Sequence, residues 1–299
     1  MKLREYIATH DNPLTNFIKF FFYKISNKYY SVSDIIKSTE KLDNGYLRVE
    51  LRDGLVLFCA PSENKSEMQF SDRVKYGKAS RLENIEDVDR YFFIYEILSE
   101  LFVNNIHFEH FEPEPGDTVI DCGANIGGFT LQAAKKVGPE GRVIAIEPDR
   151  KNIETLNMAI LENDFKNITV VEKGLWSEKK VLEFNISNRP GEHSLCAADV
   201  NRYENRTVKI EVDTLDNILD DLGVEDASFL KMDIEGAEIE AVKGAEKLLS
   251  KEDLIWIIEA SHIVDGKPAY DKVLPFLKER GLNIYDFESE MRGTIVAKK

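Results

Sequence analysis

Cysteine is scarce in this chain of 299 residues, and the three that it has, Cys59, Cys122 and Cys196, lie far apart. An odd number of distant cysteines, without a Cys-x-x-Cys pair or a Cys/His metal spacing, argues against a disulfide framework and is typical of reduced thiols in the cytosol. The chain also lacks an apolar run long enough to cross a bilayer and a segment patterned like a signal peptide. We therefore expect a cytoplasmic protein without a transmembrane segment.

Basic residues are outnumbered, because 39 Lys and Arg stand against 54 Asp and Glu, for a formal net charge of -15. A protein that grips nucleic acid over a broad surface needs an excess of positive charge. The sequence therefore predicts that nucleic acid is not a partner. Hydrophobic residues make up 43% of the chain, which is enough to bury the core of a large α/β domain that carries an extension.

The chain divides near residues 113–116, a turn-rich Pro-Glu-Pro-Gly stretch that precedes the first buried strand pattern. We expect residues 1–110 to form a smaller N-terminal region of mixed helix and hairpin, and residues 111–299 to form the main domain. Within the N-terminal region, residues 46–51 and 55–60 flank Arg-Asp-Gly, which predicts a hairpin.

Aromatic residues interleaved with lysines crowd a short segment between Phe17 and Tyr30. Such a segment is suited to touch a membrane surface or another subunit, and the plainer alternative is a helix that caps the main domain. We favour the cap because the apolar stretch is short. Apolar residues at helical spacing between positions 85 and 102 predict a second helix that packs on the same domain.

From residue 117 onward, apolar strand patterns alternate with helical ones. This alternation predicts an α/β fold with a mostly parallel sheet covered on both faces, and a short link between the last two strands predicts an antiparallel hairpin at the edge. The alternation breaks between residues 173 and 227, where 181–186 and 207–212 predict extra strands or an inserted hairpin. The expected strands are 117–122, 142–147, 168–172, 228–233, 254–259, 283–287 and 293–297, and the expected helices are 127–137, 149–163, 236–249 and 269–280.

Ligands of open α/β sheets bind beyond the carboxyl ends of the strands. A glycine-rich turn at this edge lets a nucleotide-like ligand approach bare backbone, and a carboxylate after the second strand can accept hydrogen bonds from ribose hydroxyls. These positions form the candidate cofactor site: Asp121, Gly123, Asn125 and Gly127 in the turn, and Glu147 and Pro148 after the second strand.

Two cofactors use such an arrangement, a nicotinamide dinucleotide and S-adenosylmethionine. Dinucleotide sites have the pattern Gly-x-Gly-x-x-Gly, and Asn125 replaces its second glycine here. S-adenosylmethionine has no pyrophosphate and carries a sulfonium cation, which an acidic rim of Asp121 and Glu147 suits. The residues favour the methyl donor, while a dinucleotide, or two acids that merely cap helices, remain as alternatives.

Four spaced segments make the chain resemble the FkbM-type methyltransferase family. They are residues 121–130 (Asp-Cys-Gly-Ala-Asn-Ile-Gly-Gly-Phe-Thr), residues 147–149 (Glu-Pro-Asp) with Leu156, Asn157 and Asn163, residues 212–216 (Val-Asp-Thr-Leu-Asp), and residues 230–238 (Leu-Lys-Met-Asp-Ile-Glu-Gly-Ala-Glu) with Gly244, Ala245 and Leu248. The resemblance spans residues 112–262 and does not extend to 1–110. It implies a class I methyltransferase (Rossmann-like) fold, S-adenosylmethionine as the donor, and usually O-methylation.

Methyl transfer to a hydroxyl requires alignment of the reacting groups and removal of the hydroxyl proton. Asp233 and Glu235 follow the fourth strand of the main domain, and Glu259 and His262 follow the fifth, so we expect them to meet at one mouth. Our hypothesis is that Asp233 orients the donor or acceptor and that Glu235, Glu259 or His262 supplies the base. The plainer alternatives are a turn anchor for Asp233, a helix cap for Glu235 and a surface loop for His262. On ligand type these residues could hold a divalent metal, but their spacing is not a metal signature and we expect none.

Two further segments are candidates for contacts with the ligands. Gly174 and Trp176 follow the third strand, where they would border the adenine, with a core tryptophan as the alternative. Residues 189–194 contain a turn signal and a histidine, and are suited either to close over the acceptor or to form a plain surface loop.

We therefore expect an S-adenosylmethionine-dependent O-methyltransferase whose acceptor is a sugar, a glycan or a related small metabolite, as the resemblance implies. Three rival functions are an NAD-type oxidoreductase, a non-catalytic cofactor-binding module and a nucleic-acid methyltransferase. Asn125 argues against the first, the acidic groups argue against the second, and the net charge of -15 argues against the third.

Overall fold

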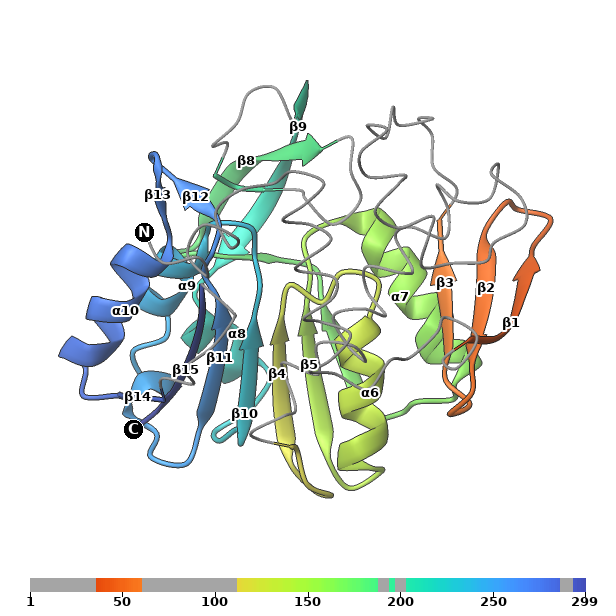
Figure 1. Cartoon of the computed structure of the whole chain (residues 1–299), viewed down its shortest axis with the longest axis horizontal. Coiled ribbons are helices and arrows are strands. Elements are labelled where there is room, and N and C mark those ends of the chain that lie inside the picture. Colours follow the sequence, from red (N-terminus) through yellow and green to blue (C-terminus); the bar gives the residue numbers. More distant parts are fainter. Residues whose placement is uncertain (1–35, 61–111, 188–193, 197–202, 286–292) are drawn as a thin grey trace, which may run out of the picture.

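The computed structural model describes residues 36–60, 112–187, 194–196, 203–285 and 293–299 (Figure 1). The aromatic segment near the N-terminus, the helix expected between positions 85 and 102, and nearly all of the loop 189–194 lie outside these residues. The expectations for those segments therefore remain predictions.

A seven-stranded sheet with the strand order β14-β15-β11-β10-β4-β5-β6 forms the centre of the structure. The strands are β4 (Thr118–Cys122), β5 (Arg142–Ile146), β6 (Ile168–Val171), β10 (Phe229–Met232), β11 (Ile255–Glu259), β14 (Asn283–Tyr285) and β15 (Thr294–Lys298). Neighbours from β11 to β6 run parallel, whereas β15 runs antiparallel to both β11 and β14. The mostly parallel sheet with an antiparallel edge hairpin is thus confirmed.

The strands read as continuous apolar runs because both faces of the sheet are covered. Successive side chains point to opposite faces, so Val119 and Phe229 join one hydrophobic cluster while Ile120 and Leu230 join the other. All four side chains are essentially inaccessible to solvent. This double burial fixes the register that brings the carboxyl ends of β4, β5 and β10 to one edge.

Helices cover the two faces in separate groups (Figure 1). α6 (Gly128–Val137) and α7 (Arg150–Glu162) contribute to the first cluster, and α8 (Leu215–Asp221), α9 (Glu238–Lys243) and α10 (Tyr270–Glu279) contribute to the second. α7 begins after Asp149, whose carboxylate accepts hydrogen bonds from the N–H groups of Lys151 and Asn152. The helix expected over 236–249 is shorter than predicted, since α9 ends before Gly244 and a 3-10 turn follows at Leu248–Ser250.

A second, three-stranded sheet lies between β6 and α8 in the chain, with the order β7-β9-β8. Its strands are β7 (Gly174–Leu175), β8 (Lys180–Ser187) and β9 (Tyr203–Asp213), and β8 pairs antiparallel with β9. The inserted hairpin predicted from the sequence is therefore confirmed. A small pair, β12 (Ile263–Val264) and β13 (Lys267–Pro268), follows β11.

The described part of the N-terminal region is an antiparallel sheet of β1 (Ile36–Lys41), β2 (Leu47–Leu51) and β3 (Val56–Cys59). The hairpin of β2 and β3 matches the prediction, whereas β1 was not expected. β3 lies beside α7, where Val56 exchanges two hydrogen bonds with the side chain of Asn163. Because the buried side chains of β2 and β3 share a cluster with α6, this sheet packs on the main domain.

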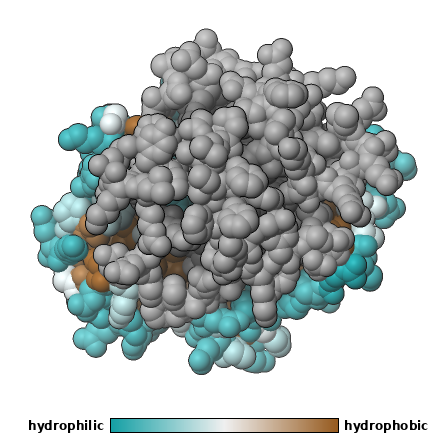
Figure 2. Space-filling view, in the orientation of Figure 1, coloured by the Kyte–Doolittle hydropathy of each residue, from teal (hydrophilic) through white to brown (hydrophobic). Residues whose placement is uncertain are grey.

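In the part of the chain that the structure describes, no helix combines the length and apolarity needed to cross a membrane. On the face seen in Figure 2, the coloured side chains at the rim are mainly hydrophilic, with smaller hydrophobic areas between them.

A candidate active site at the carboxyl ends of the strands

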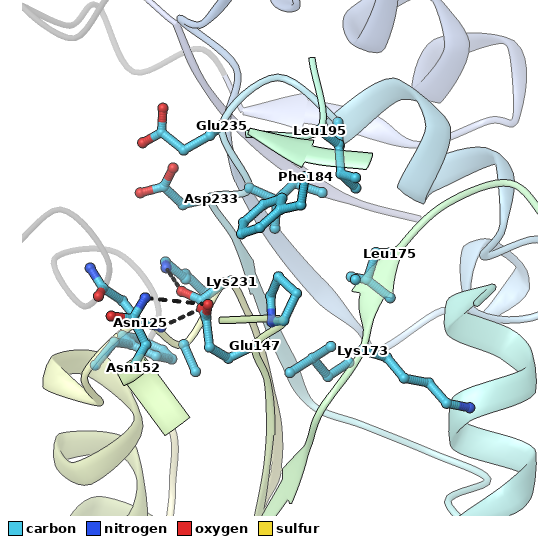
Figure 3. Close-up of a pocket in the computed structure, with 18 of the residues that line it drawn as sticks. Asn125, Glu147, Asn152, Lys173, Leu175, Phe184, Leu195, Lys231, Asp233 and Glu235 are labelled. Atoms are coloured by element: carbon cyan, nitrogen blue, oxygen red, sulfur yellow. Dashed lines mark hydrogen bonds between the residues drawn. The ribbon is translucent and has the colours of Figure 1, made fainter. Parts of the chain in front are cut away.

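A pocket opens at the carboxyl ends of the parallel strands, where open α/β sheets bind ligands (Figure 3). The space between its walls, including space open to solvent, is about 940 Å³. Its lining comes from six segments of the chain, which contribute Gly123, Ala124 and Asn125, then Glu147 and Pro148, then Lys173, Gly174 and Leu175, then Phe184, then Leu195, and finally Lys231, Asp233 and Glu235.

The glycines of the turn after β4 are required by packing. Gly123 has a φ of +82°, and a Cβ on it would lie 1.9 Å from the carbonyl oxygen of Asp233. Gly127 has a φ of +93°, and a Cβ there would lie 2.4 Å from Leu156 of α7. Gly123 therefore lets the turn contact the segment after β10, and Gly127 lets the turn contact α7. Gly127 does not line the pocket.

Glu147 is a buried carboxylate at the floor of the pocket, with 6% of its surface exposed. Its Oε2 accepts a hydrogen bond from the N–H of Asn125 at 2.9 Å, and its Oε1 accepts from the N–H of Asp149 at 2.9 Å and from Nδ2 of Asn152 at 3.3 Å (Figure 3). Burial raises the pKa of Glu147 to about 7, although these hydrogen bonds pull it down. Since a carboxylate oxygen can accept two hydrogen bonds, Oε2 retains capacity for a hydroxyl of a ligand.

Asn125 supplies a second indication that the pocket is built for a polar ligand. Its Oδ1 atom is buried and has no hydrogen-bond partner among the residues described. A buried acceptor of this kind costs free energy unless a ligand or water satisfies it. The remaining accepting capacity of the Glu147 carboxylate and this open acceptor on Asn125 fit the hydroxyl and amino groups of the expected cofactor, which can donate to them.

Asp121 lies beneath the glycine-rich turn and does not line the pocket. It is fully buried, accepts a hydrogen bond from the hydroxyl of Thr130, and lies 3.5 Å from Nζ of Lys231. Burial raises the pKa of Asp121, whereas the charge of Lys231 lowers it. Lys231 also donates to the carbonyl of Gly123 at 3.0 Å, so Asp121 can influence a ligand only through the turn and this lysine.

Asp233 and Glu235 lie side by side beyond the end of β10, on the side of the pocket opposite Glu147 (Figure 3). The Oδ1 atom of Asp233 is buried and has no hydrogen-bond partner among the described residues. Glu235 has a φ of 54°, a left-handed conformation that non-glycine residues seldom adopt. Nε2 of His262, between β11 and β12, lies 3.3 Å from Oε2 of Glu235 and 3.7 Å from Oδ1 of Asp233.

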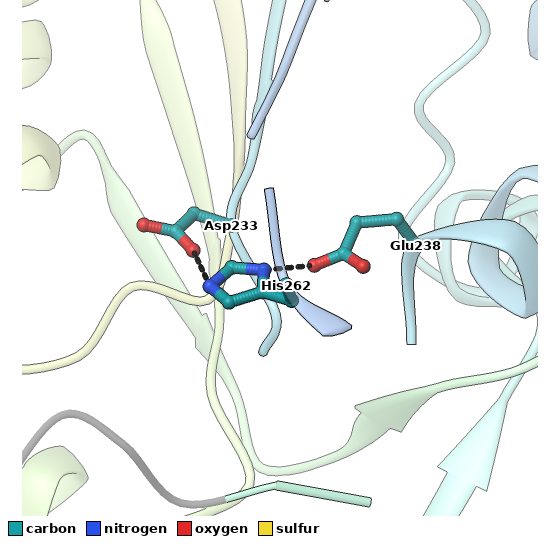
Figure 4. A group of neighbouring side chains, drawn as sticks. All are labelled: Asp233, Glu238 and His262. Carbon is teal, nitrogen blue, oxygen red and sulfur yellow. Dashed lines mark hydrogen bonds and ion pairs between the residues drawn. The ribbon is translucent and has the colours of Figure 1, made fainter. Parts of the chain in front are cut away.

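His262 is bound on its other side by Glu238, whose Oε1 lies 3.1 Å from Nδ1 (Figure 4). Burial by itself lowers the pKa of His262, but the hydrogen bonds and charges of Glu235 and Glu238 outweigh it and raise the pKa to about 11. A histidine that is already protonated at neutral pH cannot remove the proton from the hydroxyl group of a methyl acceptor. This arrangement argues against His262 as the base.

Glu259 is not brought into the pocket, although it ends the strand next to β10. Its Oε2 accepts a hydrogen bond from the hydroxyl of Thr294 in β15 at 2.6 Å, and its Oε1 accepts from the N–H of Ser261 at 3.3 Å. Trp176 likewise does not line the pocket, and Nζ of Lys180 lies 5.1 Å from the centroid of its ring. Gly174 and Pro148 do line it, as the sequence predicts.

Within the described residues, the side chains that could together hold a metal ion are Asp233, Glu238 and His262, whose ligand atoms lie within 4.8 Å of one another. Oε1 of Glu238 already accepts hydrogen bonds from the N–H groups of Ile234 and Gly236, in addition to facing His262. The Oε2 atom of Glu238 is buried and, like Oδ1 of Asp233, has no hydrogen-bond partner among the described residues.

Comparison with known proteins shows the family. The model of the methyltransferase FkbM domain matches residues 121–284, which is more than half of the chain. The chain belongs to the FkbM methyltransferase family. This confirms the resemblance from which S-adenosylmethionine was expected as the donor, and it identifies the protein as a methyltransferase.

Three relatives illustrate the similarity. Methyltransferase sdnD of Sordaria araneosa is 26% identical over 213 residues, which cover 62% of this chain and 77% of sdnD. The solved methyltransferase FkbM of Methylobacillus flagellatus has a TM-score of 0.44 and 22% identity, covering 67% of this chain and 47% of that one, so this chain spans about half of its length. The structure of Aeropyrum pernix fibrillarin, which holds natively bound S-adenosyl-L-methionine, has a TM-score of 0.43 and 14% identity, with coverages of 88% and 98%.

Several residues of the pocket and its surroundings were not foreseen as site residues of this methyltransferase. Phe184 and Leu195 line the pocket from the inserted hairpin and the segment after it, and nothing local in the sequence shows where a hairpin will pack. Glu238 is part of the motif at 230–238, but an acid at the start of a helix reads as an ordinary helix-end residue. Its complete burial is the feature that distinguishes it, and only the structure reveals this.

Proposed function

We propose that this methyltransferase transfers a methyl group from S-adenosylmethionine to a hydroxyl of a sugar, a glycan or a related small metabolite. The main support is that one pocket joins the Glu147 cradle to the carboxylates of Asp233 and Glu235. The two groups come from different strand ends and face the same space (Figure 3). A cofactor side and a proton-accepting side are what methyl transfer to a hydroxyl requires.

The residues on the cofactor side would hold the adenosine part of the donor. Oε2 of Glu147 would accept a hydrogen bond from a ribose hydroxyl, and Pro148 and Leu175 would border the adenine. When bound, the donor supplies a methyl group already activated by its positively charged sulfur. The task of the protein is then mainly alignment, which can be worth effective molarities of about 10⁵–10⁸ M.

On the acceptor side, Asp233 is the residue best placed to take the hydroxyl proton. Its Oδ1 atom is buried and lacks a hydrogen-bond partner among the described residues, and it lies 3.7 Å from Nε2 of His262. Glu235 is held more closely by the same nitrogen, at 3.3 Å. Phe184 and Leu195 lie near these carboxylates and give the space an apolar wall (Figure 3). An apolar wall opposite acidic groups suits a hydroxylated ring that has one carbon-rich face.

This function is tested by incubating the purified protein with S-adenosylmethionine and a panel of sugars, glycans and hydroxylated metabolites, and measuring formation of S-adenosylhomocysteine. We expect product with at least one hydroxyl acceptor, and mass spectrometry should find the added methyl on oxygen. Methylation on nitrogen or carbon instead would contradict the proposed acceptor class.

The affinity for S-adenosylhomocysteine should increase as the pH is raised through 7. The pKa of Glu147 is raised to about 7, so much of this carboxyl is protonated at about pH 6 and most is ionised at about pH 8. The ribose hydroxyl donates to the ionised form, so affinity is gained as pH rises and lost as it falls, by about tenfold over this range. Calorimetric titration at several pH values measures the effect.

The matched control for this pH dependence is Glu147→Gln, which keeps the shape of the side chain but cannot ionise. Its affinity should be weaker and nearly independent of pH across the same range. A wild-type affinity that falls with rising pH, or an identical profile in the variant, would contradict the assignment of Glu147.

A further inference from the structure

Glu238 is a carboxylate that the proposed reaction does not use. It is the first residue of α9, and none of its surface is exposed. Its Oε1 atom accepts hydrogen bonds from the N–H groups of Ile234 at 3.3 Å and Gly236 at 3.0 Å, and faces Nδ1 of His262 at 3.1 Å. Burying a carboxylate is costly unless a charge compensates it, and His262 is the cationic side chain in contact with it.

Both ring nitrogens of His262 face carboxylates, since Nδ1 faces Glu238 and Nε2 faces Glu235 (Figure 4 shows the first contact). An ionised carboxylate can only accept hydrogen bonds, so two ionised partners require both nitrogens to donate and the ring to be an imidazolium. The raised pKa of His262, about 11, agrees with this geometry.

Among the described residues, the charged side chains paired with His262 are all acidic. Asp233 and Glu235 face it from the segment after β10, and Glu238 faces it from α9. Cys196 lies on the same side of Gly236 as His262, since a Cβ on Gly236 would lie 3.3 Å from Cβ of Cys196 and 3.9 Å from Cβ of His262. Burial raises the pKa of the Cys196 thiol to about 11, so this thiol is neutral.

The turn that carries Glu235 needs to be held in place. Glu235 and Gly236 both have positive φ, 54° and 101°, and the first of these is unfavourable for a residue with a side chain. Glu238 binds the N–H groups on either side of Glu235, and the hydroxyl of Ser194 donates to the carbonyl of Glu235 at 2.5 Å. The backbone and the side chain of Glu235 are thus both tied to neighbouring groups.

We propose that Glu238 and His262 form a clamp of two positioning residues, in which Glu238 fixes the imidazolium and the imidazolium holds Glu235 and Asp233 toward the acceptor space. This inference rests on the proposed function at one point, namely that the carboxylates of Asp233 and Glu235 interact with the methyl acceptor. His262 is then neither a base nor a metal ligand, because a proton occupies the position that a cation would take.

The protonation of the ring can be tested without any activity. The full chain, free of ligand, is labelled with ¹⁵N-histidine, and its imidazole signals are followed from about pH 6 to about pH 9, with His262 assigned from the His262→Gln spectrum. We expect both ring nitrogens of His262 to stay protonated across this range in the wild type. In Glu238→Gln, the pH at which half of the His262 rings lose a proton should be markedly lower than in the wild type. A midpoint near 6.5 in the wild type, or a shift to a metal-bound signal on addition of Mg²⁺ or Mn²⁺, would overturn the clamp.

The positioning role is tested by kinetics of His262→Gln and Glu238→Gln. Each should lower kcat by about tenfold or more and leave the affinity for S-adenosylhomocysteine within about twofold of wild type. In His262→Gln the acidic limb of the pH–rate profile should move upward by about one pH unit, because the carboxylates lose a neighbouring cation. A merely structural defect would lower the rate without moving this limb.

The matched control is Glu240→Gln, on the same helix but bonded to Ser177 and Lys243 outside the pocket, which should behave like wild type. An acidic limb that is the same in His262→Gln and wild type would overturn the positioning role. A wild-type protein that keeps its imidazolium but methylates no hydroxyl acceptor would contradict the proposed function, while the clamp itself would stand.

Discussion

Replacing Asp233 by Asn should lower kcat by about 10²–10⁴-fold, the usual contribution of a well-placed proton acceptor. Asp233 lines the pocket, and its buried Oδ1 atom has no hydrogen-bond partner among the described residues. Asparagine preserves the shape of the side chain but cannot accept the proton of the hydroxyl. Because the change lies on the acceptor side, the affinity for S-adenosylhomocysteine should stay within about twofold of wild type.

Glu259→Gln is the matched control for Asp233→Asn. It also exchanges a carboxylate for an amide at the end of the neighbouring strand, but its side chain is bonded to Thr294 and Ser261, away from the pocket. We expect its kcat to lie within about twofold of wild type. Equal losses in the two variants, or full activity of Asp233→Asn, would show that Asp233 does not take the proton.

Gly123→Ala should lower the free energy of unfolding by about 2–5 kcal/mol, the sum of a left-handed backbone and a steric overlap. The φ of Gly123 is +82°, and the added Cβ would lie 1.9 Å from the backbone oxygen of Asp233. Backbone cannot yield as a flexible side chain can, so the turn after β4 and the segment after β10 must move apart. Denaturant unfolding measures the stability, and calorimetry should show that cofactor binding is lost as well.

Gly116→Ala separates the two contributions. Gly116 has a φ of +94°, yet nothing lies within 4 Å of the Cβ that alanine would add. This variant should lose only the conformational term, about 1–2 kcal/mol. If Gly123→Ala were no less stable than Gly116→Ala, the close contact between the turn and Asp233 would not exist as described.

The central sheet could be predicted from the sequence because its inner strands, such as β4, β5 and β10, are short apolar runs, buried on both faces and followed by polar turns. The elements that were missed lack such a signal. β1 has the sequence Ile-Lys-Ser-Thr-Glu-Lys and is almost wholly exposed, so no apolar pattern marks it. α8 has 7 residues, which is too few for a helical repeat to stand out from the strand before it.

The residues of the candidate site likewise fall into those that a local sequence pattern indicates and those that only tertiary packing reveals. Glu147 and Asp233 were found because each directly follows a buried strand, and Glu235 because it lies two residues beyond Asp233, a signal that is local in the sequence. The direction of a side chain at a strand end depends on its neighbours in space, so Glu259, bonded to Thr294 of β15, could not be excluded in advance. The complete burial of Glu238 and Asp121 also follows from tertiary packing.

The central claim is that S-adenosylmethionine lies in this pocket with its ribose held by Glu147. Calorimetric titration of the folded wild-type protein and of Glu147→Ala with S-adenosylhomocysteine tests it most directly. We expect the wild-type protein to bind at about micromolar concentrations and the variant to bind at least about tenfold more weakly. No detectable binding by folded wild-type protein, or equal affinities for the two proteins, would contradict it.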